Sequence, residues 1–470
     1  MSEKDKTYVE NVDRGVYDIK NDFKYSKKTE EGLNEEIVRM ISAEKHESEK
    51  MLSRRLEALK IFDRKKNPDW GPDLSEVDMN KITTYIRPDA KMTDDWKEVP
   101  EDISDIFCKL GIPEAEHEGL LSGVGAQYDS EIVYHNMQED LSSQGVIYTD
   151  FESAVKKYPD IIDKYFGKCI SPSLHKYAAL HYAVWSGGSF VYVPEGVKVD
   201  IPLQSYFRLN APGAGQFEHT LIILEKNSYC HFIEGCSAPR YNQVNLHAGA
   251  VELFVSENST LRYSTIENWS RNMYNLNTKR AIVQKNGTIQ WISGSFGSHV
   301  SMLYPTSVLA GENAKSEFTG ISFAGYDQNL DTGAQVIHAA KNTSSTINSK
   351  SISKDGGIAV YRGLVDIKKG ATGSKNSTSC ESLMLDDKSR SDTIPVIKIE
   401  NKKVDLGHEA KIGRISDDVI FYLMSRGISE DEAKQMVVRG FAEPVAKELP
   451  LAYAVEMNNL INLELVGSIG

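Results

Sequence analysis

The segment from Val255 to Gly287 reads VSENSTLRYSTIENWSRNMYNLNTKRAIVQKNG and contains one full period of a repeat. At each end an apolar residue is followed three positions later by Asn258 or Asn286, and then by a small residue. Asn and Gly tolerate the left-handed backbone conformation that tight turns require. Between the two turns, β-branched and aromatic residues are mixed with polar ones, which is typical of strands. The segment is therefore predicted to form strands between two turns.

The same turn element recurs over more than 200 residues of the chain. Its turn residue stands at Gly196, Asn227, Asn258, Asn286, Asn313, Asn342 and Gly370, with a weaker copy at Asn401. The successive intervals are 31, 31, 28, 27, 29, 28 and 31 residues. A regular period of this length is typical of a solenoid and leaves no room for a helix and two strands in each repeat. We expect a parallel β-helix, because the blades of a β-propeller need about 40 residues or more.

Helical patterns flank the repeat on both sides. Apolar residues recur at helical spacing over 33–62, and a further short helix is expected over 128–141. Near the other end, Ser416 and Ser429 each precede acidic residues, which is the pattern of a capped helix start. The predicted fold is mainly β. It consists of an N-terminal helical domain over 1–150, a β-helix core over 151–408 and a C-terminal helical domain over 409–470.

The composition narrows the functional classes. Asp and Glu number 67 and Lys and Arg 54, giving a formal charge of −13, whereas nucleic-acid binding needs clustered positive charge. No apolar run approaches the roughly 18 residues of a membrane span, and the charged N-terminus lacks the apolar core of a secretory signal. The five cysteines are too few for a disulfide framework. We expect a cytoplasmic protein with free thiols that binds neither nucleic acid nor membrane.

Among chemically active groups, the cysteines offer the clearest candidates. The P-loop, G-x-S-x-G, H-E-x-x-H and C-x-x-C motifs are all absent from the sequence. Cys230 and Cys236 would lie about 20 Å apart on an extended strand, so they share a metal only if the chain bends. Cys380 precedes His408 by 28 residues, close to one repeat, and Glu409 follows directly. Thiolate, imidazole and carboxylate groups on neighbouring coils would suit a transition metal, although the local interval of 31 residues offsets the stack by about three. The alternative is a set of buried structural polar residues.

Longer stretches carry a specific resemblance over essentially the whole chain. They include the segments 126–128, 134–137, 183–190, 202–204, 215–218, 234–239, 342–346, 391–395, 408–410 and 422–427. With these segments the chain resembles the SufB/SufD family, which assembles iron–sulfur clusters. Residues 456–458 and 467–470 look like the SufB members rather than the paralogous SufD members.

The resemblance implies a right-handed parallel β-helix that serves as an assembly scaffold and not as an enzyme. Cys236 would receive sulfur as persulfide from a cysteine desulfurase or sulfur-transfer protein. Cys380 would build a transient iron–sulfur cluster at a subunit interface, with Glu409 and His408 beside it as further ligands. Five repeats separate the two cysteines, roughly 25 Å at ~4.8 Å per coil, so sulfur would need relays or a tunnel.

Further residues match positions that line the sulfur route in the family. These are Arg208, Asn210, Trp269 and Lys285. Glu267 departs from the family, which usually has Gln there, and a carboxylate at this position would repel an anionic persulfide.

The resemblance also implies partners. The ATPase SufC would dock on the C-terminal helices and supply ATP hydrolysis, and SufD or a second copy of the chain would pair through the β-helix. A reduced flavin is reported for the family, but the sequence carries no motif for it. Two alternatives from other classes are an extracellular β-helical polysaccharide lyase or hydrolase and a purely structural subunit. The absence of a signal peptide and of paired carboxylates on one repeat counts against the first, and the two cysteines count against the second.

Overall fold

The repeated turn residues form a ladder along one edge of a parallel β-helix, which confirms the predicted fold. The turn residues from Asn227 to Asn342 all have φ between 54° and 60°, the left-handed region. Asn258 Nδ2 donates to Asn227 Oδ1 at 3.0 Å, and Asn286 Nδ2 donates to Asn258 Oδ1 at 2.9 Å. Asn313 continues the series at 3.0 Å. Each turn is thus hydrogen-bonded to the turn of the previous coil.

One turn differs from its predicted register. The left-handed residue of the seventh turn is Gly373, with φ 79°, and not Gly370. Asn342 N donates to Thr372 O, so Gly373 follows directly after the residue that pairs with Asn342. The reason is that the loop after Ile367 is longer than its counterparts, which moves the turn by three residues.

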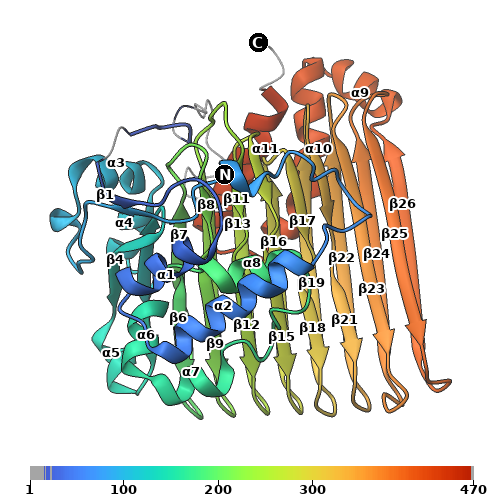
Figure 1. The fold of residues 1–470 in the computed structure, drawn as a ribbon. Coiled ribbons are helices and arrows are strands. Elements are labelled where there is room, and N and C mark those ends of the chain that lie inside the picture. Colours follow the sequence, from blue (N-terminus) through green and yellow to red (C-terminus); the bar gives the residue numbers. More distant parts are fainter. Residues whose placement is uncertain (1–14, 16, 22–23, 467–470) are drawn as a thin grey trace.

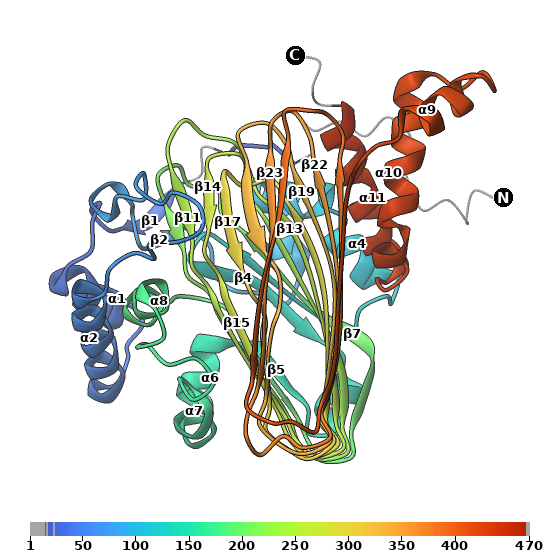
Figure 2. The ribbon, with the colours of Figure 1, turned by 90° about the vertical axis from the view of Figure 1, so that its right-hand side faces the viewer.

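The computed structural model describes residues 15, 17–21 and 24–466 and shows two facing sheets (Figures 1 and 2). The first sheet is continuous, and all its neighbours are parallel except for the terminal pair β3 and β4. Its strands, in spatial order, are β26 (Asp405–Arg414), β24 (Lys375–Met384), β22 (Ser344–Ser353), β19 (Lys315–Ala324), β16 (Thr288–Phe296), β13 (Thr260–Asn268), β10 (Tyr229–Ser237), β7 (Lys198–Arg208), β3 (Gly123–Tyr128) and β4 (Glu131–Met137).

The second sheet consists of two rows of shorter strands that join at one long strand, β23. The first row is β5 (Ile147–Asp150), β6 (Ser189–Val193), β9 (His219–Leu224), β12 (Ala250–Val255), β15 (Thr278–Val283), β18 (Thr306–Leu309), β21 (Gln335–His338) and β23 (Ile358–Ile367). The second row continues from β23 through β20 (Asn329–Thr332), β17 (Val300–Leu303), β14 (Met273–Asn275) and β11 (Asn245–His247) to β8 (Gly215–Gln216). Strand β25 (Arg390–Ile399) pairs with β23 in the last coil. A separate small sheet pairs β1 (Tyr25–Lys28) with β2 (Ile86–Pro88).

Helices cover both outer faces of the β-helix. Buried residues of the N-terminal helices α1 and α2 and of α8 pack on the second sheet, and those of α10 and α11 pack on the first (Figure 2). The N-terminal helices are α1 (Glu35–Glu44), α2 (Glu49–Arg64), η3 (Met79–Lys81), η4 (Trp96–Glu98), α3 (Glu101–Lys109), α4 (Ile112–His117), α5 (Glu139–Ser143), α6 (Phe151–Lys157), α7 (Pro159–Tyr165) and α8 (Lys176–Val184). The C-terminal helices are α9 (Asp417–Met424), α10 (Glu430–Ala446) and α11 (Leu451–Val466). Within the described ranges, no helix combines the length and the apolar character needed to cross a membrane.

The element boundaries differ from the predicted ones in three places. The segment 128–141, expected as a helix, mainly forms β4 of the hairpin β3–β4, and only its last residues, from Glu139, belong to helix α5. Strand β4 pairs with β3, which pairs with β7 in the first sheet. Asp150 caps α6, so helices continue to residue 184, inside the range assigned to the β-helix. Strand β26 runs through residue 408 to Arg414, because no Pro interrupts it and β24 pairs with its whole length. The C-terminal helices then begin at Asp417.

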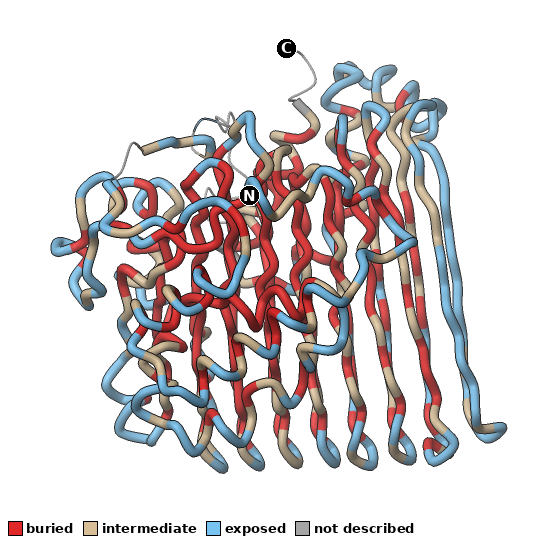
Figure 3. Tube along the Cα trace, in the orientation of Figure 1, coloured by how far each residue is buried: buried red, intermediate tan, exposed pale blue. Residues whose placement is uncertain are grey.

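The last coil leaves one end of the β-helix open. Figure 3 shows the strands of this coil as largely exposed, in contrast to the buried interior of the preceding coils. Strand β26 is the terminal strand of the first sheet. Exposed apolar side chains on the two last strands are Ile394, Val396, Ile397, Ile399 and Ile412. Such a surface, next to an unpaired strand edge, is typical of a protein contact.

Candidate functional site

Cys236 and Cys380 both lie on the first sheet, five strands apart. At ~4.8 Å between neighbouring strands, this separation is about 24 Å. Strand register places Cys380 in line with Glu234, and Cys236 is two residues further along β10. The column of paired residues is Glu234, Thr265, Ser293, Gly320, Ser349 and Cys380. Since residues two apart share one face of a strand, both thiols face the interior between the sheets.

A second column starts at Cys236 itself. It runs through Glu267, Ser295, Ser322, Ser351 and Ser382. The two columns are adjacent, so small side chains and hydroxyls cover this strip of the interior from β16 to β24. Ser351 Oγ and Ser382 Oγ are 2.7 Å apart, near the Cys380 end. This strip interrupts an otherwise apolar interior.

Around Cys236 the interior contains a buried charged cluster, formed by Glu218, Glu234, Glu267, His247 and Lys279. Lys279 Nζ lies 2.8 Å from Glu234 Oε1 and 3.5 Å from Glu267 Oε1. Burial opposes its charge, but the two carboxylates raise the pKa of Lys279 above its ordinary value. The ammonium is therefore retained and is shared between two glutamates.

The histidine extends the cluster to the third glutamate. Asn275 Nδ2 donates to Glu267 Oε2 at 2.7 Å, and His247 Nδ1 donates to Asn275 Oδ1 at 2.8 Å. His247 Nε2 is hydrogen-bonded to Glu218 Oε1. Burial opposes protonation, but Glu218 and then Glu267 raise the pKa of His247. Three carboxylates are therefore balanced by one ammonium and one imidazole inside the β-helix.

Several buried polar atoms in or beside the cluster lack a hydrogen-bond partner among the described residues. Glu218 Oε2, Trp269 Nε1 and both amide atoms of Asn277 are buried without a hydrogen-bond partner in the described part of the chain. Leaving such groups unpaired costs about 1–3 kcal/mol each, so interiors rarely keep them without a role. The site therefore has spare hydrogen-bonding capacity for a guest.

The charges set the state of the Cys236 thiol. Burial, and then Glu234, Glu218 and Glu267, raise the pKa of Cys236 well above its ordinary value, while Lys279 acts in the opposite direction. The sulfur lies 4.0 Å from Glu234 Oε1. Burial also raises the pKa of Glu267. In this state Cys236 is a thiol, and the cation of Lys279 is the group that favours a thiolate there.

Of the other residues predicted for the sulfur route, Trp269 belongs to the Cys236 environment. It shares an apolar cluster with Cys236, and its ring centroid is 4.7 Å from that of His247. Arg208 pairs with Ser237 and so lies on the opposite face of the sheet. Its guanidinium donates to Ile19 O at 2.8 Å and to Tyr17 O at 3.1 Å.

Asn210, beyond the end of β7, also contacts this N-terminal segment. Its Nδ2 donates to Asn21 O at 3.1 Å, and its backbone N donates to Asp129 Oδ1 at 2.7 Å. Arg208 and Asn210 therefore anchor residues 17–21 over the end of β7 and do not contact the Cys236 sulfur.

The structure separates Lys285 from the other predicted route residues. Lys285 lies in the exposed turn before Asn286, and its Nζ is 3.5 Å from Glu257 Oε1. The buried lysine is Lys279, six positions earlier, which the sequence analysis did not select. The available signal was alternation, because Ala281 and Val283 are buried and residue 279 shares their face.

The second site surrounds Cys380. The thiol is buried and hydrogen-bonded to the Tyr361 hydroxyl; burial raises the pKa of Cys380 to about 12, and Tyr361 partly offsets this. Its partner in register on β26 is Ala410, so His408, two residues earlier, has the same facing. The ring centroids of Tyr361 and His408 are 6.5 Å apart.

Glu409 is directed differently. It alternates with His408 and so faces away from the interior, where its Oε1 lies 3.0 Å from Lys411 Nζ and its side chain is 63% exposed. The structure therefore brings Cys380 and His408 to one face and leaves Glu409 on the other. Within the described ranges, no group of three His, Cys, Asp or Glu side chains is arranged to hold a metal ion.

Small spaces lie along the strip between the two sites. One is lined by Glu267, Lys279 and Ser293, and the next by Ser293, Gly320 and Ser349, so they share a wall. Each has a volume of about 10 Å³, close to one water molecule. Ser349 is the register partner of Cys380 on β22.

Two protein-family models match most of the chain. Residues 207–441 match the SufBD core domain of SUF system FeS cluster assembly, and residues 35–205 match the SufBD protein N-terminal region. An iron–sulfur cluster assembly SufBD family protein of Staphylococcus aureus (strain MRSA252) is 51% identical over 94% of this chain and 95% of its own length. The iron–sulfur cluster assembly protein SufB of Bacillus subtilis (strain 168) is 50% identical over the same shares. The chain belongs to the SufB/SufD family of the SUF system of iron–sulfur cluster assembly.

Proposed function

We propose that the chain is a scaffold that accepts sulfur as persulfide at Cys236 and assembles a transient cluster at Cys380. The observation that most directly supports this proposal is the continuous interior strip of small and hydroxylated residues between the two thiols. It links the charged cluster to Ser349, next to Cys380. The remainder of the interior is filled by large apolar side chains such as Phe232, Tyr263 and Trp291.

The chemistry of entry follows from thiol exchange. The Cys236 thiolate attacks the outer sulfur of a donor persulfide, a new S–S bond forms at Cys236, and the donor thiol leaves. The donor would be a cysteine desulfurase or a sulfur-transfer protein. Lys279 stabilises the thiolate and the persulfide anion, while the three glutamates limit how long an anion stays. Each sulfur then needs two electrons to become sulfide, and a reduced flavin remains the expected source.

The cluster site is incomplete within one chain. Cys380 and His408 share the interior face at the open end, and two ligands are fewer than a cluster requires. The exposed apolar residues of β25 and β26 surround this end. We expect SufD or a second copy of the chain to cover it and to supply the missing ligands. Glu409 would join only if the partner contact turned it inward.

The C-terminal helices offer a second contact surface. On α9, Phe421 is 73% exposed and Tyr422 56%, with Val419 and Met424 beside them. Large exposed apolar groups on one short helix suit docking of the SufC ATPase, which would supply ATP hydrolysis. The scaffold itself would hydrolyse nothing. Helix α9 contacts α10, and α10 and α11 pack on the first sheet, so movement of α9 would then reach the strands that carry both thiols.

A time course with labelled sulfur tests this function. Full-length chain in complex with its partners is loaded anaerobically with labelled sulfur from a desulfurase, and labelled peptides are mapped over time. The proposal predicts label first at Cys236 and later at Cys380. Ser293→Leu fills the wall shared by the two interior spaces and should hold the label at Cys236. The matched control is Gln290→Leu, which changes an outward residue of the same strand. Label reaching Cys380 equally fast in S293L would refute the interior route.

A further inference from the structure

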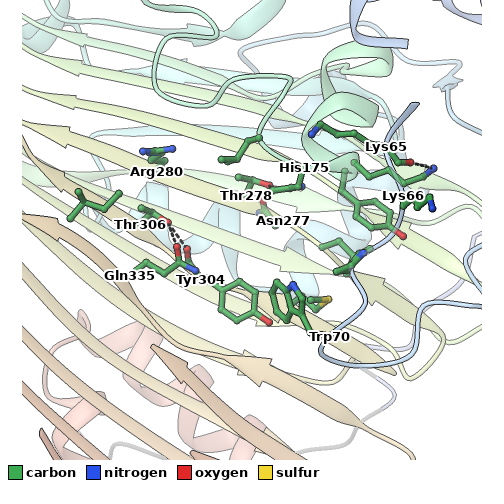
Figure 4. Close-up of a pocket in the computed structure, with 17 residues that line it drawn as sticks. Lys65, Lys66, Trp70, His175, Asn277, Thr278, Arg280, Tyr304, Thr306 and Gln335 are labelled. Carbon is green, nitrogen blue, oxygen red and sulfur yellow. Dashed lines mark hydrogen bonds between the residues drawn. The ribbon is translucent and has the colours of Figure 1, made fainter. Parts of the chain in front are cut away.

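A cavity of about 660 Å³ lies on the outer face of the second sheet (Figure 4). One wall is the loop that follows α2 together with the start of α8, and the other is formed by β15, β17, β18 and β21. A volume of this size suits a small molecule of about mononucleotide size.

Four cationic residues contribute to the otherwise mainly apolar lining of the cavity, although the protein is acidic. Lys65, Lys66, Lys176 and Arg280 line it, and no carboxylate does. Among the described residues, none of Lys65, Lys66 and Arg280 forms an ion pair, and Arg280 Nε is buried without a hydrogen-bond partner. In a chain of net charge −13, unpaired cations gathered around one cavity favour an anionic guest.

An aromatic wall faces the same space. The rings of Trp70 and Tyr304 are 6.0 Å apart at 50°. Arg362 holds this wall in place, because its guanidinium lies 4.6 Å from the Trp70 ring and donates to both carboxylate oxygens of Asp331. The Tyr304 hydroxyl donates to Asp331 Oδ1 at 2.8 Å. Trp70 nevertheless remains 46% exposed, so its ring is available for stacking on a flat guest.

The hydroxyl of Thr278 lies between these two walls and can donate a hydrogen bond to a ligand. His175 Nδ1 accepts the Ala178 backbone N–H, so its proton is on Nε2, which donates to Thr278 Oγ1 at 3.2 Å. Burial lowers the pKa of His175 to about 4, which keeps the ring neutral. Thr278 accepts this bond and keeps its own hydroxyl proton to donate. Helix α8 begins here, and its N-terminus adds partial positive charge.

We propose that this cavity binds a phosphorylated ligand with a flat heteroaromatic ring, that is, a ligand of the mononucleotide class. The phosphate lies against Lys65, Lys66 and the start of α8, and the ring stacks on Trp70. Arg280, on the opposite wall, donates to a second polar group of the ligand. The site makes and breaks no bond, and it stands whether or not sulfur passes from Cys236 to Cys380.

Calorimetric titration of the full-length chain tests the site. AMP and riboflavin 5′-phosphate present one phosphate with a small and a large ring, ribose 5-phosphate lacks the ring, and adenosine lacks the phosphate. We expect saturable binding of at least one ringed phosphate. Removal of the ring or of the phosphate should weaken binding about tenfold or more, since stacking and charge-assisted contacts are each worth ~1–3 kcal/mol.

Variants connect that binding to this cavity. Lys66→Glu and Trp70→Leu should each weaken the ringed phosphate about tenfold. Lys60→Glu, an exposed lysine of α2 that does not line the cavity, is the matched control and should bind as the wild type does. Melting temperatures show that each variant is folded. The proposal is overturned if no ringed phosphate saturates the wild type, if K66E and W70L bind unchanged, or if ribose 5-phosphate binds as tightly as AMP.

Discussion

Glu234 on β10 and Cys380 on β24 occupy one register column of the first sheet, although 146 positions separate them in the sequence. The column begins with a carboxylate bonded to Lys279 and continues through Thr265, Ser293 and Gly320, all small and uncharged. The column itself carries no charge beyond the Cys236 end. Lys350 also lines the second space, but its Nζ lies 2.8 Å from Glu381 Oε2. A sulfur anion leaving the Cys236 end would therefore meet mainly hydroxyl groups, which favours onward transfer over storage.

Cys380 is expected to be indispensable for the cluster. Cys380→Ser removes the thiolate that binds iron but preserves the size and burial of the side chain. Reconstitution of the complex with iron and sulfide should then give cluster absorbance and acid-labile sulfide at background level. Cys230→Ser, a buried thiol of the same interior on β10, is the matched control and should retain the cluster. Full cluster content in C380S would remove this residue from the mechanism.

Lys279 is expected to matter far more than Lys285. Lys279→Met leaves Glu234 and Glu267 buried without their cation, and breaking such a pair costs about 3–5 kcal/mol of unfolding free energy. Lys285→Met removes only an exposed pair worth about 0–1 kcal/mol. Urea unfolding followed by tryptophan fluorescence measures both. Adding Glu234→Gln to K279M should restore part of the loss; equal stability of K279M and K285M would contradict the buried cluster.

The reactivity of Cys236 should follow the charges around it. Its raised pKa means slow alkylation by iodoacetamide at pH 7.5 and a rate that still rises above pH 9, where an ordinary thiol with a pKa near 8.5 levels off. Glu267→Gln removes a negative neighbour without opening the site, so it should lower the pKa of Cys236 and speed alkylation. Peptide mass spectrometry measures the rate at each cysteine.

The same pKa has a consequence for stability. Because folding raises the pKa of Cys236, the folded chain keeps this proton where the unfolded chain releases it. The contribution is intact below the unfolded pKa of about 8.5 and is lost as pH rises further. Cys236→Ala should therefore flatten the loss of stability between pH 8.5 and 10. An unchanged slope would mean that Cys236 titrates normally in the folded state.

The repeat predicted the architecture because its signal is local. Asn at each turn specifies a left-handed residue, and the interval between turns sets the length of a coil. Register within the coil depends on loop length, which composition does not reveal, and so the seventh turn falls at Gly373 and not at Gly370. The same dependence on register explains why the sequence analysis selected the exposed Lys285 and not the buried lysine. Matching Lys285 to a family position from the resemblance did not point to Lys279, whose inward direction depends on where β15 begins.

Side-chain direction limited the prediction at the second site as well. Cys380, His408 and Glu409 were grouped by their separation of about one repeat, but alternation along β26 divides them. His408 shares the face of Cys380, and Glu409 lies on the other. The sequence also held no sign of the interior strip, because its members come from six different strands and only the sheet brings them into line.

The open end of the β-helix is expected to be the subunit contact. Ile397 and Ile399 pair with Val365 and Ile367, which are buried, so both face the interior of the last coil. No further coil covers them, and they are 45% and 52% exposed. Glutamate at either position would place a charge in a contact that buries apolar surface. Ile397→Glu should therefore weaken association with SufD or with a second copy about tenfold or more, equivalent to ~1.4 kcal/mol.

Sedimentation measures this association, and Ile201→Glu is the matched control. Ile201 is similarly exposed, at 42%, but lies on β7, two strands from the opposite end of the first sheet. If the open end is the interface, I397E dissociates. It also loses the cluster, because the ligands missing beside Cys380 come from the partner. I201E should remain associated and keep its cluster. If I397E dissociates but retains its cluster, the contact is correct and the shared ligand set is wrong. If I397E associates as the wild type does, the partner binds elsewhere, and Cys380 and His408 would have to hold the cluster without it.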